Sequence, residues 1–197
     1  MEPEEEMQVV ATLHLSDTKD LLFYTHTFHN RRLGAIRVFI DTPKYSGPTK
    51  SGFDMTLGQL KELAQVLYPL PEELESGSLV PPLEVARIGG KGKGSIWVIQ
   101  IVEPEGTTPG QCLDVRKYVE SERFTGWTKK GLRIDVDLVD EMLDRLPALV
   151  EALEDWEAGR TGLFAPSPAP QVPKERQEPK SDSPILDSIP DDLKSYF

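Results

Sequence analysis

The chain has 197 residues, of which 38% are hydrophobic, and a formal net charge of −11. This length suits one ordinary domain or two very small ones that share a core, and the low hydrophobic fraction indicates that part of the chain lies outside any core. No apolar run reaches the ~18 residues that cross a bilayer, and MEPEEEM at the N-terminus lacks the pattern of a signal peptide, so we expect a cytoplasmic protein with no membrane contact. Cys112 is the only cysteine, which excludes an intrachain disulfide and a cysteine zinc cluster.

Taken in chain order, the hydrophobic pattern predicts two sets of four strands, each set followed by a helix. Short β-branched or aromatic runs bounded by turn residues predict the strands, at 9–15, 21–28, 35–40, 51–57, 83–88, 95–102, 112–119 and 131–136. Apolar residues then recur at helical spacing from Leu60 until Pro69 ends the first helix. The second helix begins near Leu138, and Pro147 should kink it.

A gap-free internal repeat is the strongest signal in the sequence. The segment IRVFIDTPKYSGPTKSGFDM (36–55) aligns with VRKYVESERFTGWTKKGLRI (115–134) at an offset of 79 residues, and both keep the string [YF]-x-G-x-T-K-x-G in register. We therefore predict an α+β fold of two β4α repeats, with antiparallel curved sheets each backed by a helix. One such unit is marginal alone, so the two should share a core as an intrachain pseudo-dimer.

Basic and acidic residues are segregated along the chain. Residues 31–50 carry five bases against one acid, and residues 87–133 carry nine bases against five acids. Acids gather in the first six residues and between Asp140 and Glu157. We expect a basic face and an acidic back, because the field that a polyanion meets depends on the charges near it rather than on the sum.

Cations and aromatic rings are mixed on the open face that we expect for the sheets. Strand alternation places Arg37 with Phe39 on one side of the first copy, and Arg116 with Tyr118 on the matching side of the second. Cations follow phosphates and rings stack on bases, at ~1–3 kcal/mol per base, so the mixture predicts single-strand binding. The candidate nucleic-acid-binding residues are Phe28, Arg31, Arg37, Phe39, Lys44, Tyr45, Lys50, Lys91, Lys93, Arg116, Tyr118, Arg123, Phe124, Trp127, Lys129 and Lys130.

The turn aromatics, the glycine-rich stretch and the histidines also allow interpretations other than ligand binding. Tyr45 and Phe124 equally fit core aromatics that fix the turn. The stretch GGKGKG (89–94) lacks the spacing of a phosphate-binding loop and is typical of a basic hairpin turn. The three histidines have no repeated carboxylate or nucleophile partner, and His26 and His29 should point to opposite faces, so we expect no enzyme activity, no cofactor and no metal site.

The repeated string resembles the C-terminal domain of the transcriptional positive-cofactor-four family, a β4α single-strand binder related in fold to the plant Whirly proteins. The resemblance rests on IRVFIDTPKYSGPTKSGFDMTLGQLKEL and VRKYVESERFTGWTKKGLRIDV, and with the preceding strands it spans roughly residues 8–157. It implies that one chain supplies both halves of a channel that the family builds from a dimer.

By position, the resemblance assigns the family's strand arginine to Arg37 and Arg116. It assigns the basic residues ahead of the turn glycine to Lys50, Lys129 and Lys130. The family's hairpin aromatic falls on Phe28 in the first copy, whereas the second copy has Thr107 there. Its tryptophan at the end of the arginine strand is replaced by Ile40 and Val119, for which Trp127 in the next loop is a substitute.

From Gly162 the chain is proline-rich, polar and without periodicity, which predicts a disordered linker. The final ILDSIPDDLKSYF resembles the acidic, phenylalanine-ended tip of bacterial single-stranded DNA-binding proteins, which implies docking of replication or repair proteins. The alternative is an acidic terminus without a role. The candidate partner-binding residues are Asp191, Asp192, Leu193, Tyr196 and Phe197.

Together these features predict six segments and a leading function. The segments are an acidic N-terminus (1–7), a first β4α repeat (8–70), a linker (71–82), a second repeat (83–158), a disordered linker (159–184) and an acidic tip (185–197). The leading hypothesis is a nucleoid-associated protein that coats or organises single-stranded DNA in replication, recombination or repair. A transcription cofactor or nucleoid protein on melted DNA is the alternative, and an adaptor without nucleic-acid binding is a third. RNA as the ligand and further self-association remain open.

Overall fold

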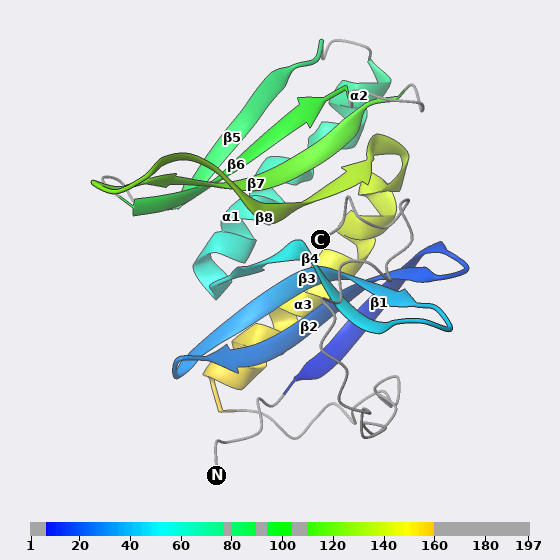
Figure 1. Ribbon diagram of the computed structural model, residues 1–197, viewed down its shortest axis with the longest axis vertical. Helices are drawn as coiled ribbons and strands as arrows, with labels where there is room; N and C mark the ends of the chain where they lie inside the picture. The colour runs from blue at the N-terminus through cyan, green and yellow to red at the C-terminus, as the bar shows by residue number, and fades with distance from the viewer. Residues whose placement is uncertain (1–6, 77–79, 90–93, 104–109, 160–197) are drawn as a thin grey trace, which may run out of the picture.

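In the computed structural model the chain has an α+β fold, in which four strands and a helical segment occur twice in succession (Figure 1). The structure describes residues 7–76, 80–89, 94–103 and 110–159. The first four strands are β1 (Gln8–Ser16), β2 (Lys19–Phe28), β3 (Arg31–Asp41) and β4 (Ser46–Met55), followed by α1 (Leu57–Leu67) and α2 (Leu70–Glu75). The second four are β5 (Leu83–Gly89), β6 (Gly94–Val102), β7 (Cys112–Glu120) and β8 (Thr125–Asp135), followed by the 3-10 turn η1 (Val136–Leu138) and α3 (Val139–Glu157).

All eight strands belong to one sheet, in the order β1-β2-β3-β4-β8-β7-β6-β5. Within each set of four the pairing is antiparallel. Among the described residues, the strands of the two sets pair at a short parallel contact, where Ser51 and Gly52 of β4 meet Gly131 of β8 (Figure 1). The expectation of curved sheets, one in each repeat, is therefore corrected: β4 and β8, the last strand of each set, pair with one another at the centre, and the eight strands form one sheet that is not curled.

The helices cross between the two sets of strands. The long helix α3, which follows β8, packs against β1, β2 and β3, whereas α1, which follows β4, contacts β5 as well as β3 and β4. Figure 1 shows α1 behind β5–β8 and α3 behind β1–β4. Each half of the sheet is thus backed by a helix, but the first four strands are covered mainly by the helix that follows the second set.

Gly34 in β3 makes this crossing possible. A Cβ atom at Gly34 would lie 2.5 Å from Leu60 Cδ1 of α1 and 3.3 Å from Leu149 of α3, so the glycine leaves room for both helices. The helices are further joined by an ion pair between Lys61 and Glu154, at 2.5 Å. Arg145 Nε of α3 donates to the carbonyl of Thr12 in β1, at 2.9 Å. One core, from Leu13 to Leu153, fills the space between sheet and helices.

Several element boundaries differ from the sequence prediction. β4 begins at Ser46 and β8 at Thr125, earlier than the predicted 51 and 131, so Lys50, Lys129 and Lys130 lie within strands. Bulges at Arg37/Phe39 and at Arg116/Tyr118 allow the glycine-rich strings to pair despite their turn-like composition. The predicted linker contains most of α2, and Pro147 lies inside α3. No helix among the described residues is both long and apolar enough to cross a membrane.

Candidate nucleic-acid interface

The turn before β4 and the turn before β8 have the same hydrogen bonds. Thr42 Oγ1 donates to the carbonyl of Tyr45 and accepts from its N–H, at 3.0 and 3.1 Å. Ser121 Oγ makes the same pair of bonds with Phe124, at 2.9 and 3.1 Å. These residues are 79 positions apart, as in the sequence alignment. Each turn therefore fixes an aromatic residue at the start of the strand that forms the central contact.

The threonines of the repeated string close the two bulges in the same way. Thr49 Oγ1 donates to the carbonyl of Val38, at 3.0 Å, and Thr128 Oγ1 donates to that of Lys117, at 2.9 Å. Each hydroxyl also accepts a backbone N–H two residues later, from Ser51 and from Lys130. Satisfying these backbone groups holds the bulged strands in a fixed geometry, which positions the lysines beside each threonine.

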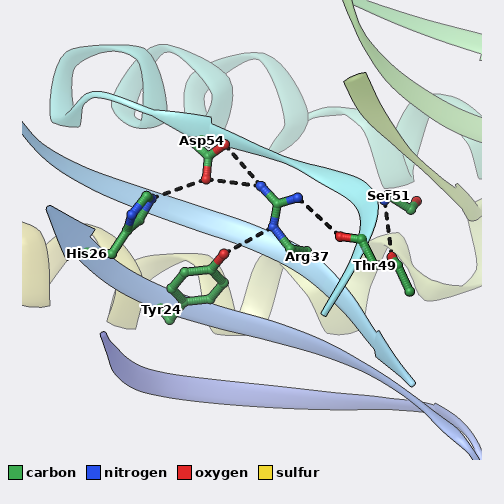
Figure 2. Close-up of polar contacts among 6 residues, drawn as sticks. All are labelled: Tyr24, His26, Arg37, Thr49, Ser51 and Asp54. Atoms are coloured by element: carbon green, nitrogen blue, oxygen red, sulfur yellow. Dashed lines mark hydrogen bonds and ion pairs between the residues drawn. The ribbon is translucent and has the colours of Figure 1, made fainter. Parts of the chain in front are cut away.

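Arg37 lies in a network that uses each nitrogen of its guanidinium (Figure 2). Nε donates to the hydroxyl of Tyr24 at 3.0 Å, Nη1 to the carbonyl of Thr49 at 3.2 Å, and Nη2 to Asp54 at 3.0 Å. His26 also contacts Asp54, at 3.1 Å. Burial opposes ionisation of Asp54, but the hydrogen bond with His26 and the charge of Arg37 outweigh it and hold its pKa below the ordinary value. The first-copy arginine is thus neutralised by a carboxylate of its own chain.

Arg116, the equivalent arginine, is held by a different carboxylate. Its Nε and Nη2 donate to Asp114, at 3.0 and 2.9 Å, and Gln100 donates to the same carboxylate at 3.0 Å. Arg133 Nε lies 3.5 Å from Asp114 as well. The Asp114 side chain is 1% exposed, and although burial alone would raise its pKa, the hydrogen bonds from Arg116 and Gln100 lower it. Two arginines therefore share one buried carboxylate.

A crevice of about 700 Å³ lies where β4 meets β8. Its wall takes residues from the end of β1, the start of β2, the centre of β4, and the strands β7 and β8. Among the described residues that line it, Asp135 is the one carboxylate, and the basic ones are Lys19, Lys50, Arg116, Lys129 and Arg133. Asp135, and Asp114 which Arg116 and Arg133 share, offset two of these five charges, and the positive charge that remains favours anions.

Exposed aromatic rings stand near these cations in sequence. Phe124 and Trp127 are 51% and 49% exposed, and Tyr45 and Phe28 are 38% and 51% exposed. Tyr45 and Phe124 are therefore not core residues. The Trp127 ring packs edge-on against Tyr118, with the ring centroids 5.2 Å apart, while the Tyr45 hydroxyl donates to the carbonyl of Pro48 at 2.7 Å. Such rings offer faces on which bases can stack.

The structure brings only some of the predicted binding residues together. Lys50, Arg116 and Lys129 line the crevice. Phe39 packs against Leu22 and Tyr24, in a small apolar cluster beside Arg37. Four further basic candidates are exposed but do not line the crevice: Arg31, Lys44, Arg123 and Lys130. The remaining candidates, Lys91, Lys93, Asp191, Asp192, Leu193, Tyr196 and Phe197, lie outside the described residues.

Sequence reasoning missed three cations that the fold places near the centre. Lys19 and Arg133 line the crevice. Lys117, the equivalent of the apolar Val38, lies with Nζ 5.7 Å from the centroid of the Trp97 ring, and burial followed by the nearby charge of Lys130 lowers its pKa. The position of Arg133 in the repeat was a usable signal, because its first-copy equivalent is an acid, Asp54.

The described part of the chain contains no group of three or more His, Cys, Asp or Glu side chains that could hold a metal ion. Comparison with protein-family models gives no match, and comparison with curated protein sequences gives none either.

Proposed function

We propose that this protein binds single-stranded nucleic acid, with DNA as the first ligand to test, through cations at the β4–β8 contact and aromatic rings at the two adjoining turns. The observation that carries the proposal is the crevice, where five basic side chains from both sets of strands converge although the chain has a net charge of −11. Phosphates would meet these cations, and bases would stack on the exposed rings.

We further propose that the two sets of strands and helices are diverged copies of one β4α, Whirly-like unit arranged as an intrachain pseudo-dimer. Support comes from the hydrogen bonds that recur 79 residues apart at Thr42 and Ser121 and at Thr49 and Thr128. The pairing of Gly52 with Gly131 also joins equivalent residues. We expect two diverged copies to keep the hydrogen-bonded turns that position the ligand-binding residues, while their other surface residues differ.

The distribution of charge is compatible with a polyanion on one side. Acids of α3 at positions such as Asp140, Asp144 and Glu151 are exposed on the helix-covered side. The crevice instead draws its cations from the strands. Nucleic acid approaching the strands therefore meets local positive charge rather than the average charge of the molecule.

Fluorescence anisotropy with labelled oligo-dT, measured against duplex DNA and oligo-U at several salt concentrations, tests the proposal. We expect preferential single-strand binding that weakens steeply with salt, because counterions are released from the strand. Absence of oligo-dT binding at low salt would overturn the proposal and favour a protein-interaction adaptor. The same measurement on the chain without residues 185–197 shows whether the acidic tip affects DNA binding. We propose that replication or repair proteins dock on this tip.

A further inference from the structure

The two halves of the sheet surround their strand arginine with exchanged residues. In the first half, Ala35 of β3 lies opposite Asp54 of β4. At the positions 79 residues later, Asp114 of β7 lies opposite Arg133 of β8. The carboxylate has therefore moved to the partner strand, and an arginine occupies the place that it has in the first half.

This exchange changes the local charge without removing the ion pair. In the first half the formal charges of Arg37 and Asp54 sum to zero. In the second half Arg116 and Arg133 share Asp114, which leaves one positive charge in excess. A carboxylate that is 1% exposed cannot itself meet a ligand, but it orients both guanidinium groups, whose side chains are 28% and 43% exposed.

The excess charge faces the crevice and not the first-half network. Arg116 and Arg133 line the crevice together with Lys50 and Lys129, whereas Arg37 has its guanidinium donors committed to Tyr24, Thr49 and Asp54. The volume of about 700 Å³ lies within the ~300–1,000 Å³ range of small-ligand sites, which is enough for a phosphate and its sugar. The excess positive charge of the second half thus lies at the crevice.

We propose that the crevice binds a phosphodiester group of a single strand at the boundary between the two halves, and that the carboxylate exchange confines this anchor to one side of a nearly symmetric sheet. Arg133 and Arg116 form the guanidinium part of the anchor, and Lys50 and Lys129 supply point charges. This inference rests on the proposed function and deepens it, because it assigns one asymmetric phosphate site to a protein built from two similar halves.

The sharpest test transplants the first-half arrangement into the second half with the double variant Asp114→Ala plus Arg133→Asp. Arg116 then keeps a carboxylate on the neighbouring strand, as Arg37 does, and the net charge falls by one. We expect affinity for oligo-dT to fall about tenfold and the slope of log K against log salt to shrink by roughly 0.7 for each lost phosphate contact. Lys61→Ala, on α1, makes the same change in net charge away from the crevice and should leave both quantities unchanged.

A second variant keeps the test decisive if the transplant does not fold, as judged by circular dichroism. Lys129→Gln changes one exposed side chain of the crevice and should weaken binding about threefold to tenfold with an unchanged melting temperature. If the wild type binds oligo-dT while the crevice variants match Lys61→Ala, the crevice is not the binding site, but single-strand binding by this protein still stands. If the wild type does not bind at all, the proposed function itself fails.

Inorganic pyrophosphate serves as the competing probe, because a free phosphate compound shares the chemistry of a phosphodiester. We expect oligo-dT to remain bound at pyrophosphate concentrations that change ionic strength only slightly. Displacement by micromolar pyrophosphate would assign the crevice to a free phosphate compound and overturn its assignment to a strand.

Discussion

Gly52 of β4 pairs with Gly131 of β8, and each glycine also lies against the backbone of the arginine in its own half. A Cβ atom at Gly52 would be 2.8 Å from the Cα of Arg37, and one at Gly131 would be 3.0 Å from the Cα of Arg116. The two halves therefore meet at a point where the backbones of four strands, β3, β4, β7 and β8, approach closely, and only glycine leaves the necessary space.

Gly131→Ala should destabilise the fold. Its Cβ would also lie 2.5 Å from the carbonyl oxygen of Val115, so the central strands must separate, at a cost of about 1–3 kcal/mol. Urea unfolding followed by circular dichroism measures the change. Gly58→Ala in α1 is the matched control, because a Cβ there meets nothing within 4 Å and alanine favours a helix. Equal unfolding midpoints for the two variants would contradict the close approach.

The first half should not fold alone. Because α3 packs against β1, β2 and β3, a fragment of residues 1–80 leaves the inner face of those strands uncovered. We expect a poorly dispersed NMR spectrum for this fragment and recovery of a folded complex when residues 81–159 are added. A cooperative thermal transition of the isolated fragment would show that α1 suffices as its cover.

Stability should fall at acid pH through Asp54 and Asp114, whose folded-state pKa values are both lowered. The stabilisation is fully present above the ordinary Asp pKa of ~3.9 and is lost as pH falls through the folded value. Asp114→Asn removes its share of this dependence, so its unfolding free energy should vary less between pH 5 and pH 3. At pH 7 this variant should be about 2–3 kcal/mol less stable, below the ~3–5 kcal/mol of fully buried pairs, because Arg116 and Arg133 stay partly solvated.

Asp41→Asn is the control for this pH series, since Asp41 lies exposed at the end of β3. Its unfolding profile should follow that of the wild type over the same pH range. An Asp114→Asn profile as steep as that of the wild type would show that Asp114 does not contribute to the acid sensitivity.

Loss of the exposed rings should weaken binding without unfolding the protein. Trp127→Ala or Phe124→Ala removes one stacking surface, worth ~1–3 kcal/mol per base, so the Kd for oligo-dT should rise about 5-fold to 150-fold. Tyr68→Ala, equally exposed at the end of α1, controls for loss of a surface ring and should leave the Kd unchanged. The measurement is anisotropy at one fixed salt concentration. Similar Kd values for all three variants would exclude stacking at the β8 turn.

Cys112 should react slowly while the protein is folded. Burial, followed by its hydrogen bond to Asp135, raises the pKa of this thiol to about 11, so about a hundredfold less thiolate is present at pH 8 than for an ordinary cysteine. Alkylation by iodoacetamide, followed by mass spectrometry, should be at least ~100 times slower in buffer than in urea. Comparable rates would show that the environment around Cys112 opens readily.

Local features could be predicted from the sequence: eight strands, a helix from about Leu60 to Pro69, a second from about Leu138, and the repeat that places Thr49 with Thr128 and Gly52 with Gly131. These features can be predicted because hydrophobic periodicity and turn-forming residues depend on positions that are close in the chain. The starts of β4 and β8 were misplaced, since bulges and strand pairing override the turn-like composition of GPTKSG and GWTKKG.

How the two halves combine could be seen only in the folded chain. The crossing of α1 and α3 depends on the space above Gly34, and the crevice depends on the β4–β8 contact, which brings Lys19 near Arg133. The difference between Arg37 and Arg116 likewise depends on which strand presents the carboxylate, Asp54 or Asp114. No local pattern encodes such long-range proximity, because it follows from packing and strand order rather than from the periodicity of any one segment.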